Sequence, residues 1–122
     1  MGLVTLTRGN FPFQNTEEAL DIIKTNASEK DDIWVNADEK NPCIAVCTNG
    51  EYAAITFFEN EDGDMWLSFN EDNQVEVVFF LPVGEEWLPG PDVVISKDQA
   101  MECITEFLET NKRPESIKRQ AL

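Results

Sequence analysis

Residues 43–59, CIAVCTNGEYAAITFFE, decide the fold that the sequence predicts. Residues 43–48 form an apolar segment that is typical of a buried strand. Asn49 and Gly50 follow it and provide the positive φ angle that a tight hairpin requires. Residues 51–59 can then return as the partner strand. The sequence therefore predicts an antiparallel β-hairpin at this position.

Further strands are predicted on both sides of this hairpin. Residues 33–35, Ile-Trp-Val, precede it, and turns at 61–64 and 70–73 lead into apolar segments at 65–69 and 74–81. In residues 74–81 both alternating sets of positions contain apolar side chains, which is typical of a strand covered on both faces. Short strands joined by turns predict an antiparallel meander of about five strands, with residues 74–81 as a central strand.

One helix is predicted before the strands and one after them. Asn15 and Glu18 have the spacing of an N-terminal cap, and apolar residues follow at 19–23. Ser96 and Gln99 form a capping box at the start of the second helix. The apolar residues that recur at helical spacing after this box are Ala100, Cys103, Ile104, Phe107 and Leu108.

The second helix also has a clear end. Asn111 can adopt the left-handed conformation that ends a helix, and Pro114 prevents the helix from resuming. A chain of 122 residues is typical of one domain. The sequence therefore predicts a single α+β domain over residues 1–122. In it, an antiparallel meander sheet packs against an N-terminal and a C-terminal helix.

The charge of the chain limits its partners. The sequence has 24 Asp and Glu but only 9 Lys and Arg, which gives a formal net charge of -15. Residues 41–96 contain no Lys or Arg, whereas Lys112, Arg113, Lys118 and Arg119 lie near the C-terminal end. This negative field opposes binding to nucleic acid phosphates and to anionic membranes. We therefore expect neither nucleic acid nor a membrane as a partner.

The expected location is the cytoplasm. Residues 1–13 lack the apolar segment and the small-residue cleavage site of a secretory signal. No apolar stretch approaches the roughly 18 to 20 residues that a membrane span requires. Cys43 and Cys47 lie on one predicted strand with their Cα atoms about 13 Å apart, beyond the reach of a disulfide. The three cysteines are therefore expected to be reduced thiols.

Catalytic and metal-binding chemistry has little support in the sequence. The chain contains no histidine, which is the commonest general base and a frequent zinc ligand. It has no glycine-rich phosphate loop and no C-x-x-C pair. The acidic turn at 61–64 does not match a calcium-binding EF-hand loop, because aligning Gly63 places Phe58 and Phe69 where carboxylates are needed. We therefore expect a protein that is not an enzyme and that binds no metal and no cofactor.

Aromatic residues among acids are the most informative candidates for binding. We consider the case in which Met65, Leu67 and Phe69 point toward the core, on alternate positions of a strand. Trp66 and Ser68 then lie on the opposite face, beside the acidic turn. An exposed Trp in such a place is typical of an interface anchor.

A second group repeats this combination of Trp and acids. Glu85, Glu86 and Trp87 lie in a loop bounded by Pro and Gly. For both tryptophans the alternative is a role in packing. In that case one of the helices covers Trp66, and Trp87 packs against the edge of the sheet. The residues predicted to bind a partner are Glu59, Glu61, Asp62, Asp64, Trp66, Glu71, Asp72, Glu85, Glu86 and Trp87.

The C-terminal third of the chain has the segments WLP (87–89), DVVISKDQA (92–100) and TNKRP (110–114). In these segments it resembles the Imm1 family of immunity proteins from bacterial polymorphic toxin systems. That family has a short strand, a helix led by Ser or Pro, and an Arg-Pro pair before a short tail. The upstream meander resembles the family in order and spacing. The chain differs in having Asn111 where the family usually has Gly, and Arg119 where it tends to have Trp.

The resemblance implies an immunity protein that neutralises a cognate secreted toxin, a nucleic-acid deaminase or nuclease, in a one-to-one complex. Such toxins need a basic cleft, which an acidic surface can cover. Arg113 and Pro114 of the shared motif are interpreted as ending the helix, not as toxin contacts. The alternative is an acidic adaptor or DNA-mimic protein without a dedicated toxin. A DNA mimic would inhibit unrelated DNA-binding proteins, whereas an immunity protein would recognise one toxin.

Overall fold

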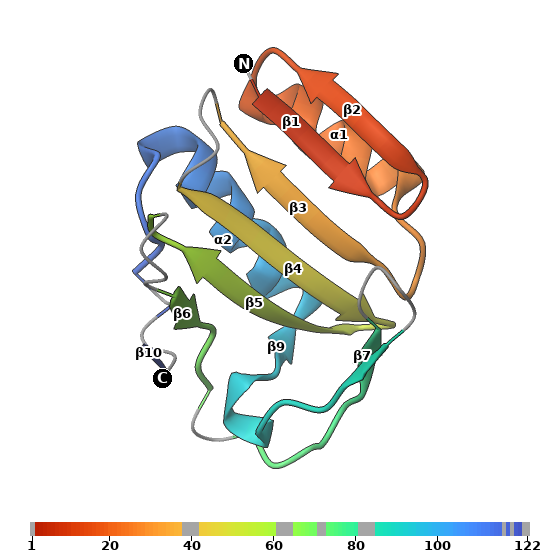
Figure 1. Ribbon diagram of the computed structural model, residues 1–122, viewed down its shortest axis with the longest axis vertical. Helices are drawn as coiled ribbons and strands as arrows, with labels where there is room; N and C mark the ends of the chain where they lie inside the picture. The colour runs from red at the N-terminus through yellow and green to blue at the C-terminus, as the bar shows by residue number, and fades with distance from the viewer. Residues whose placement is uncertain are drawn as a thin grey trace.

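An antiparallel sheet with two helices behind it forms the body of the protein (Figure 1). The large sheet has eight strands in the order β10-β6-β5-β4-β3-β1-β2, and β9 pairs with β5 along the same edge as β6. The predicted α+β fold with an N-terminal and a C-terminal helix is therefore confirmed. The structure is a computed structural model that describes residues 2–37, 42–60, 65–70, 73–80, 85–115, 117 and 119–120.

The elements follow the chain in a simple order. The strands of the large sheet are β1 (Gly2–Leu6), β2 (Gly9–Phe13), β3 (Asp32–Asn36), β4 (Cys43–Asn49), β5 (Tyr52–Phe58), β6 (Met65–Leu67), β9 (Ile95–Ser96) and β10 (Arg119–Gln120). The remaining elements are the helices α1 (Thr16–Asn26) and α2 (Lys97–Thr110), a 3-10 turn (Pro91–Val93), and a separate two-stranded sheet of β7 (Phe79–Phe80) and β8 (Glu86–Trp87).

The β4–β5 hairpin lies at the centre of the sheet, and its prediction is confirmed. Asn49 pairs with Tyr52, so the loop consists of Gly50 and Glu51, one residue later than predicted. Gly50 has a φ of 62°, a conformation that glycine adopts without strain. This register places Ile44 opposite Phe57. Alternate residues of both strands therefore point toward the helices.

The main core fills the space between the sheet and the helices. Ile44 and Phe57 contribute from the sheet, and Ile104 and Phe107 contribute from α2. The rings of Phe57 and Phe107 meet edge to face, with 5.6 Å between their centroids. Phe107 is completely buried, so the apolar stripe predicted for α2 is the face that packs on the sheet.

The predicted helix ends are also confirmed. The Asn15 side chain accepts a hydrogen bond from the Glu18 amide at 2.8 Å, and Glu18 in turn accepts one from the Gln14 amide. Ser96 caps α2 in a complete capping box with Gln99. The chain leaves α2 through Asn111, whose φ is 56°. These local bonds fix where each helix starts and stops.

The N-terminal hairpin of β1 and β2 was not predicted from the sequence. Val4 pairs with Phe11 and Leu6 pairs with Gly9, and β1 then joins β3 through Val4 and Val35. This hairpin extends the sheet beyond the five strands expected. In Figure 1 it lies at the upper right, in front of α1.

The prediction of a central strand at 74–81 is wrong. Of residues 74–80, which the structure describes, only Phe79–Phe80 is a strand, and it pairs with β8 in the separate small sheet. Val77 and Phe79 are buried against Cys47 and Ala54 on the face of the large sheet that points away from the helices. The buried apolar residues of this segment therefore cover part of the second face of the sheet, the face that points away from the helices. Val75 is 46% exposed, which a central strand would not allow.

Two of the cysteines lie on this second face, and all three carry buried thiols, as expected. Burial raises the pKa of the Cys43 thiol to about 11. The Cys47 thiol donates a hydrogen bond to a carboxylate oxygen of Asp32 at 3.3 Å. Burial thus keeps the Cys43 thiol protonated at neutral pH.

Asp31 joins the N-terminal hairpin to the rest of the sheet. Its carboxylate is buried and accepts bonds from the amide and hydroxyl of Thr7, the amide and hydroxyl of Ser28, and the amide of Asp32. Burial by itself raises the pKa of Asp31, but these hydrogen bonds outweigh it and hold the pKa below its usual value. Asp31 therefore fixes the β1–β2 turn and the α1–β3 loop at the start of β3.

Replacing Asp31 by Asn should destabilise the protein by about 2 to 3 kcal/mol at pH 7. The side-chain NH2 group of Asn is itself a hydrogen-bond donor, so it would face the N–H and O–H donors that now bind the carboxylate. Folding lowers the pKa of Asp31. The carboxylate therefore stabilises the fold at pH values above the pKa of Asp in the unfolded chain, and this stabilisation is lost as the pH falls through the pKa of the folded state. Urea unfolding at pH 7 and at pH 3 should therefore show a smaller difference between wild type and variant in acid.

Asp32→Asn is the matched control. Asp32 is also buried, but burial raises its pKa, and hydrogen bonds from Trp34 and Cys47 oppose this rise only in part. Asparagine can still accept the Trp34 bond, so the loss should stay below about 1 kcal/mol. Equal losses for the two variants would contradict the role given to Asp31.

Candidate partner-binding surface

The structure locates half of the predicted binding residues, and it divides them into two groups. Glu59 and Trp66 lie at the β5–β6 edge, and Glu85, Glu86 and Trp87 lie in and beside β8. The predicted residues that lie outside the described part of the chain are Glu61, Asp62, Asp64, Glu71 and Asp72.

Trp66 is held between the main core and two charged side chains. It pairs with Phe57 in β5, so both side chains face α2. The Arg113 guanidinium lies over the indole ring at 3.6 Å from its centroid, and the indole N–H donates to Glu59 at 3.3 Å. The prediction that Trp66 turns away from the core is therefore wrong. Arg113, interpreted as a helix-ending residue, also covers the face of Trp66.

The strand alternates as predicted, but its two faces are reversed, because the second face of the sheet is also covered here. Leu67 packs on the second face, against the cluster that contains Phe79. Ser68 is also buried: its hydroxyl accepts from the Ile55 amide at 3.0 Å and donates to the Val93 carbonyl. Phe69, predicted to lie in the core, is 37% exposed.

An open pocket of about 520 Å³ adjoins Trp66. Glu59, Lys112 and Arg113 supply the charges of its wall, so acids are not in excess there. This pocket can receive a side chain of a partner, but it does not provide the acidic field that the sequence predicts for toxin binding.

The second group presents its acids to solvent and buries its tryptophan. Glu85 and Glu86 are exposed. Trp87 is half-buried and packs on Phe79, with 6.2 Å between the ring centroids. The packing alternative therefore describes Trp87, which lies over the face of the large sheet and not at its edge.

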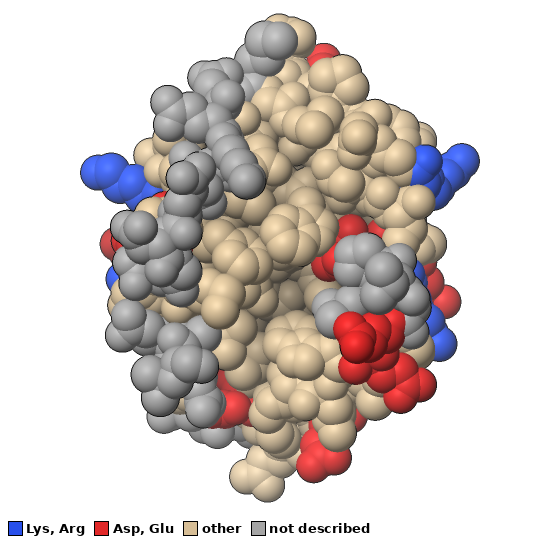
Figure 2. Space-filling model, in the orientation of Figure 1, with Lys and Arg blue, Asp and Glu red and all other residues tan. Residues whose placement is uncertain are grey.

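The two groups lie on either side of the central strands. In Figure 1, β6 lies to the left of β5 and β7 lies in front of the sheet at the right. Figure 2 shows the same face with all atoms. Uncharged side chains fill its middle, and Asp and Glu side chains lie along its right and lower margins.

Sequence reasoning missed Trp34 and Phe58 as binding candidates. Ile33 and Val35 are buried in the main core, so Trp34 between them points to the second face of the sheet. Its ring stacks on that of Phe58 with 5.2 Å between centroids and 14° between planes. The alternation of residues 32–36 was the signal that could have placed Trp34 on this face.

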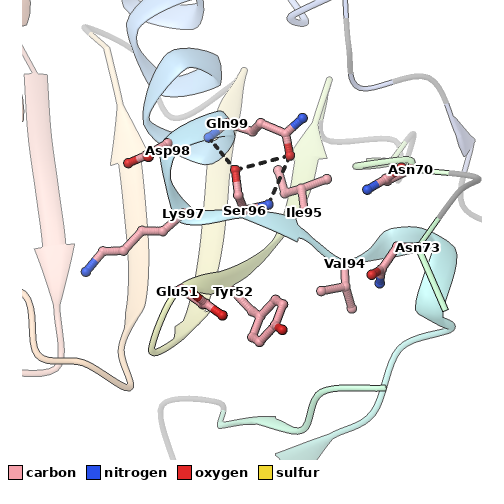
Figure 3. A pocket seen from close by; sticks show the side chains of 10 residues that line it. All are labelled: Glu51, Tyr52, Asn70, Asn73, Val94, Ile95, Ser96, Lys97, Asp98 and Gln99. Carbon is pink, nitrogen blue, oxygen red and sulfur yellow. Dashed lines mark hydrogen bonds between the residues drawn. The ribbon is translucent and has the colours of Figure 1, made fainter. Parts of the chain in front are cut away.

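A further pocket of about 440 Å³ lies beside the N-terminal end of α2 (Figure 3). Asn70 and Asn73 lie at one end of it and Lys97 lies at the other. The Gln99 amide is bonded to the Ser96 hydroxyl, and the Lys97 amide to the Glu51 carbonyl. Because these amides already have acceptors, the helix end does not offer them to an anion.

The described residues contain neither a metal-binding cluster nor a membrane-spanning helix. No group of three or more Cys, Asp or Glu side chains among them could hold a metal ion. No helix in the same residues is long and apolar enough to cross a membrane. Comparison with models of known protein families gives no match, and comparison with curated proteins gives none either.

Replacing Arg113 by Ala should lower the free energy of unfolding by about 1 kcal/mol, because the cation over the Trp66 ring is lost. Lys112→Ala is the matched control: it removes the same charge from the neighbouring, exposed position and should cost less than about 0.5 kcal/mol. Urea unfolding measures both values. Losses of equal size would contradict the contact between Arg113 and Trp66.

Proposed function

We propose that this chain is a cytoplasmic immunity protein, related to the Imm1 family, that binds and neutralises one cognate bacterial toxin. The toxin is a nucleic-acid deaminase or nuclease with a basic cleft, and the complex is one-to-one. The chain itself is not an enzyme. It acts by covering the cleft, so that nucleic acid cannot enter.

The distribution of charge is the observation that carries this proposal. Residues 41–96 contain eleven acids and no Lys or Arg. The acids of this segment that the structure describes as exposed are Glu51, Glu59, Glu76, Glu85 and Glu86. Acidic side chains on one part of a surface attract a basic domain and speed its association.

The groups that could perform chemistry are engaged inside the fold, which supports a binding role. The Asp31 carboxylate accepts hydrogen bonds from three residues, and Asp32 accepts bonds from Trp34 and Cys47. Burial raises the pKa of Cys43 and Cys47, so their thiolates are scarce at neutral pH. The sequence also contains no histidine, the commonest general base.

Charge reversal tests the proposal. A variant with Glu61, Asp62, Glu85 and Glu86 changed to Lys should associate at least tenfold more slowly with the toxin domain encoded immediately upstream, measured by stopped-flow at low salt. Its association rate should also depend less on salt, because fewer charges attract the partner.

The matched control reverses four exposed acids on the helices. The residues changed to Lys are Glu17, Asp21, Glu102 and Glu109. This control alters the net charge equally, and its association rate should stay within about threefold of wild type, because only distant charges change. Equal rates for the two variants would contradict an acidic binding surface. Inhibition of unrelated DNA-binding proteins by the wild-type chain would favour a DNA mimic and contradict immunity.

A further inference from the structure

We propose that the toxin docks on the second face of the sheet, with the stacked pair of Trp34 and Phe58 at the centre of the contact. This inference rests on the proposed function and names the surface that performs it. The open face is the part of the second face that the β7–β8 cover leaves accessible. Its residues are Leu3, Thr5, Trp34, Thr56, Phe58 and Met65.

Strand pairing places these residues on one surface. Thr5 lies opposite Trp34 in the β1–β3 pair, and Phe58 lies opposite Met65 in the β5–β6 pair. Both helices pack on the other face, as Figure 1 shows. The segment with Phe79 packs over Cys47 and Ala54, and Tyr52 and Leu67 pack against the same cluster. The rest of the sheet therefore has partly exposed side chains and no second layer among the described residues.

The open face lacks exposed charge, although the chain is rich in charge. Charged residues make up 27% of the sequence. Yet among the described side chains of β1 to β6 that point to this face, only Asp32 is charged, and it is 4% exposed. The centre of a protein interface is typically depleted of charge and enriched in aromatic residues, with polar residues around it. In Figure 2 uncharged side chains fill the middle of this face, and charged side chains, among them many Asp and Glu, lie at its margins.

The Trp34 ring is already fixed for binding. Its indole N–H donates to Asp32 at 2.9 Å, so its polar atom needs no partner from outside. Stacking on Phe58, with 14° between the planes, holds the indole ring in one orientation. A side chain that is ordered before binding loses little entropy when a partner covers it. Buried Trp residues of this kind contribute strongly to binding.

Charge complementarity identifies the occupant as a basic domain with an apolar patch surrounded by Lys and Arg. The apolar patch would cover Trp34 and Phe58, and the basic residues would meet the acids at the margin, which include Glu85 and Glu86. A second copy of the chain fits poorly, because each copy carries a charge of -15.

The test introduces an Arg side chain on the open face in one variant. In the control variant an Arg side chain is introduced on α1, on the other side of the sheet. Thr5→Arg lies opposite Trp34 and removes none of its hydrogen bonds, whereas Thr25→Arg is on the exposed side of α1. Calorimetry against the toxin domain encoded immediately upstream should show at least tenfold weaker binding for Thr5→Arg and less than a twofold change for Thr25→Arg. Trp34→Ala should also bind at least tenfold more weakly, with folding checked by circular dichroism.

The outcomes separate this inference from the proposed function. If wild type binds and Thr5→Arg binds as tightly as Thr25→Arg, the open face is not the contact, while immunity stands. If wild type does not bind the domain, both proposals fail. Sedimentation of the chain alone gives one further result: a wild-type dimer that Thr5→Arg dissociates would assign the face to a second copy and overturn the inference.

Discussion

The register of the β4–β5 hairpin is the constraint on which the rest of the structure depends. Gly50 in its left-handed conformation sets a two-residue loop, and the loop sets which residues of the two strands face each other. A slip of one residue would turn every side chain of these strands to the opposite face. Ile44 and Phe57 would leave the helices, and Phe58 would enter the core in their place.

This register also creates the two different faces of the sheet. The face toward the helices is mostly apolar and buries the main core. The other face carries small, polar and aromatic side chains, and only part of it lies under Phe79 and Trp87. In the proposed contact, this surface combines an uncharged centre with exposed acids beside it, among them Glu85 and Glu86. A basic, partly apolar partner is the ligand that such a surface suits best.

The parts of the fold with local signals could be predicted from the sequence. The caps at Asn15 and Ser96, the helix end at Asn111 and the turn at Gly50 each depend on residues within a few positions of one another. The β1–β2 hairpin and the position of Phe79 depend on contacts with distant strands, which no local pattern encodes. These elements were therefore missed or misplaced.

The candidate site was less predictable than the fold, because exposure depends on what covers each face. Trp66 and Trp87 were selected as anchors, but Arg113 covers one and the other packs on Phe79. Trp34 was assigned to a strand without a role, although alternation with Ile33 places it on the open face. The role of Asp31 was hidden as well, because its donors come from Thr7 and Ser28, in separate parts of the chain.

Calorimetric titration of the wild-type chain with the toxin domain encoded immediately upstream tests the central claim most directly. The titration is performed at low and at high salt, and the activity of the toxin is assayed in the same samples. Immunity by an acidic inhibitor predicts tight one-to-one binding that weakens with salt and abolishes activity. Absence of binding, or binding that leaves the toxin active, would contradict it.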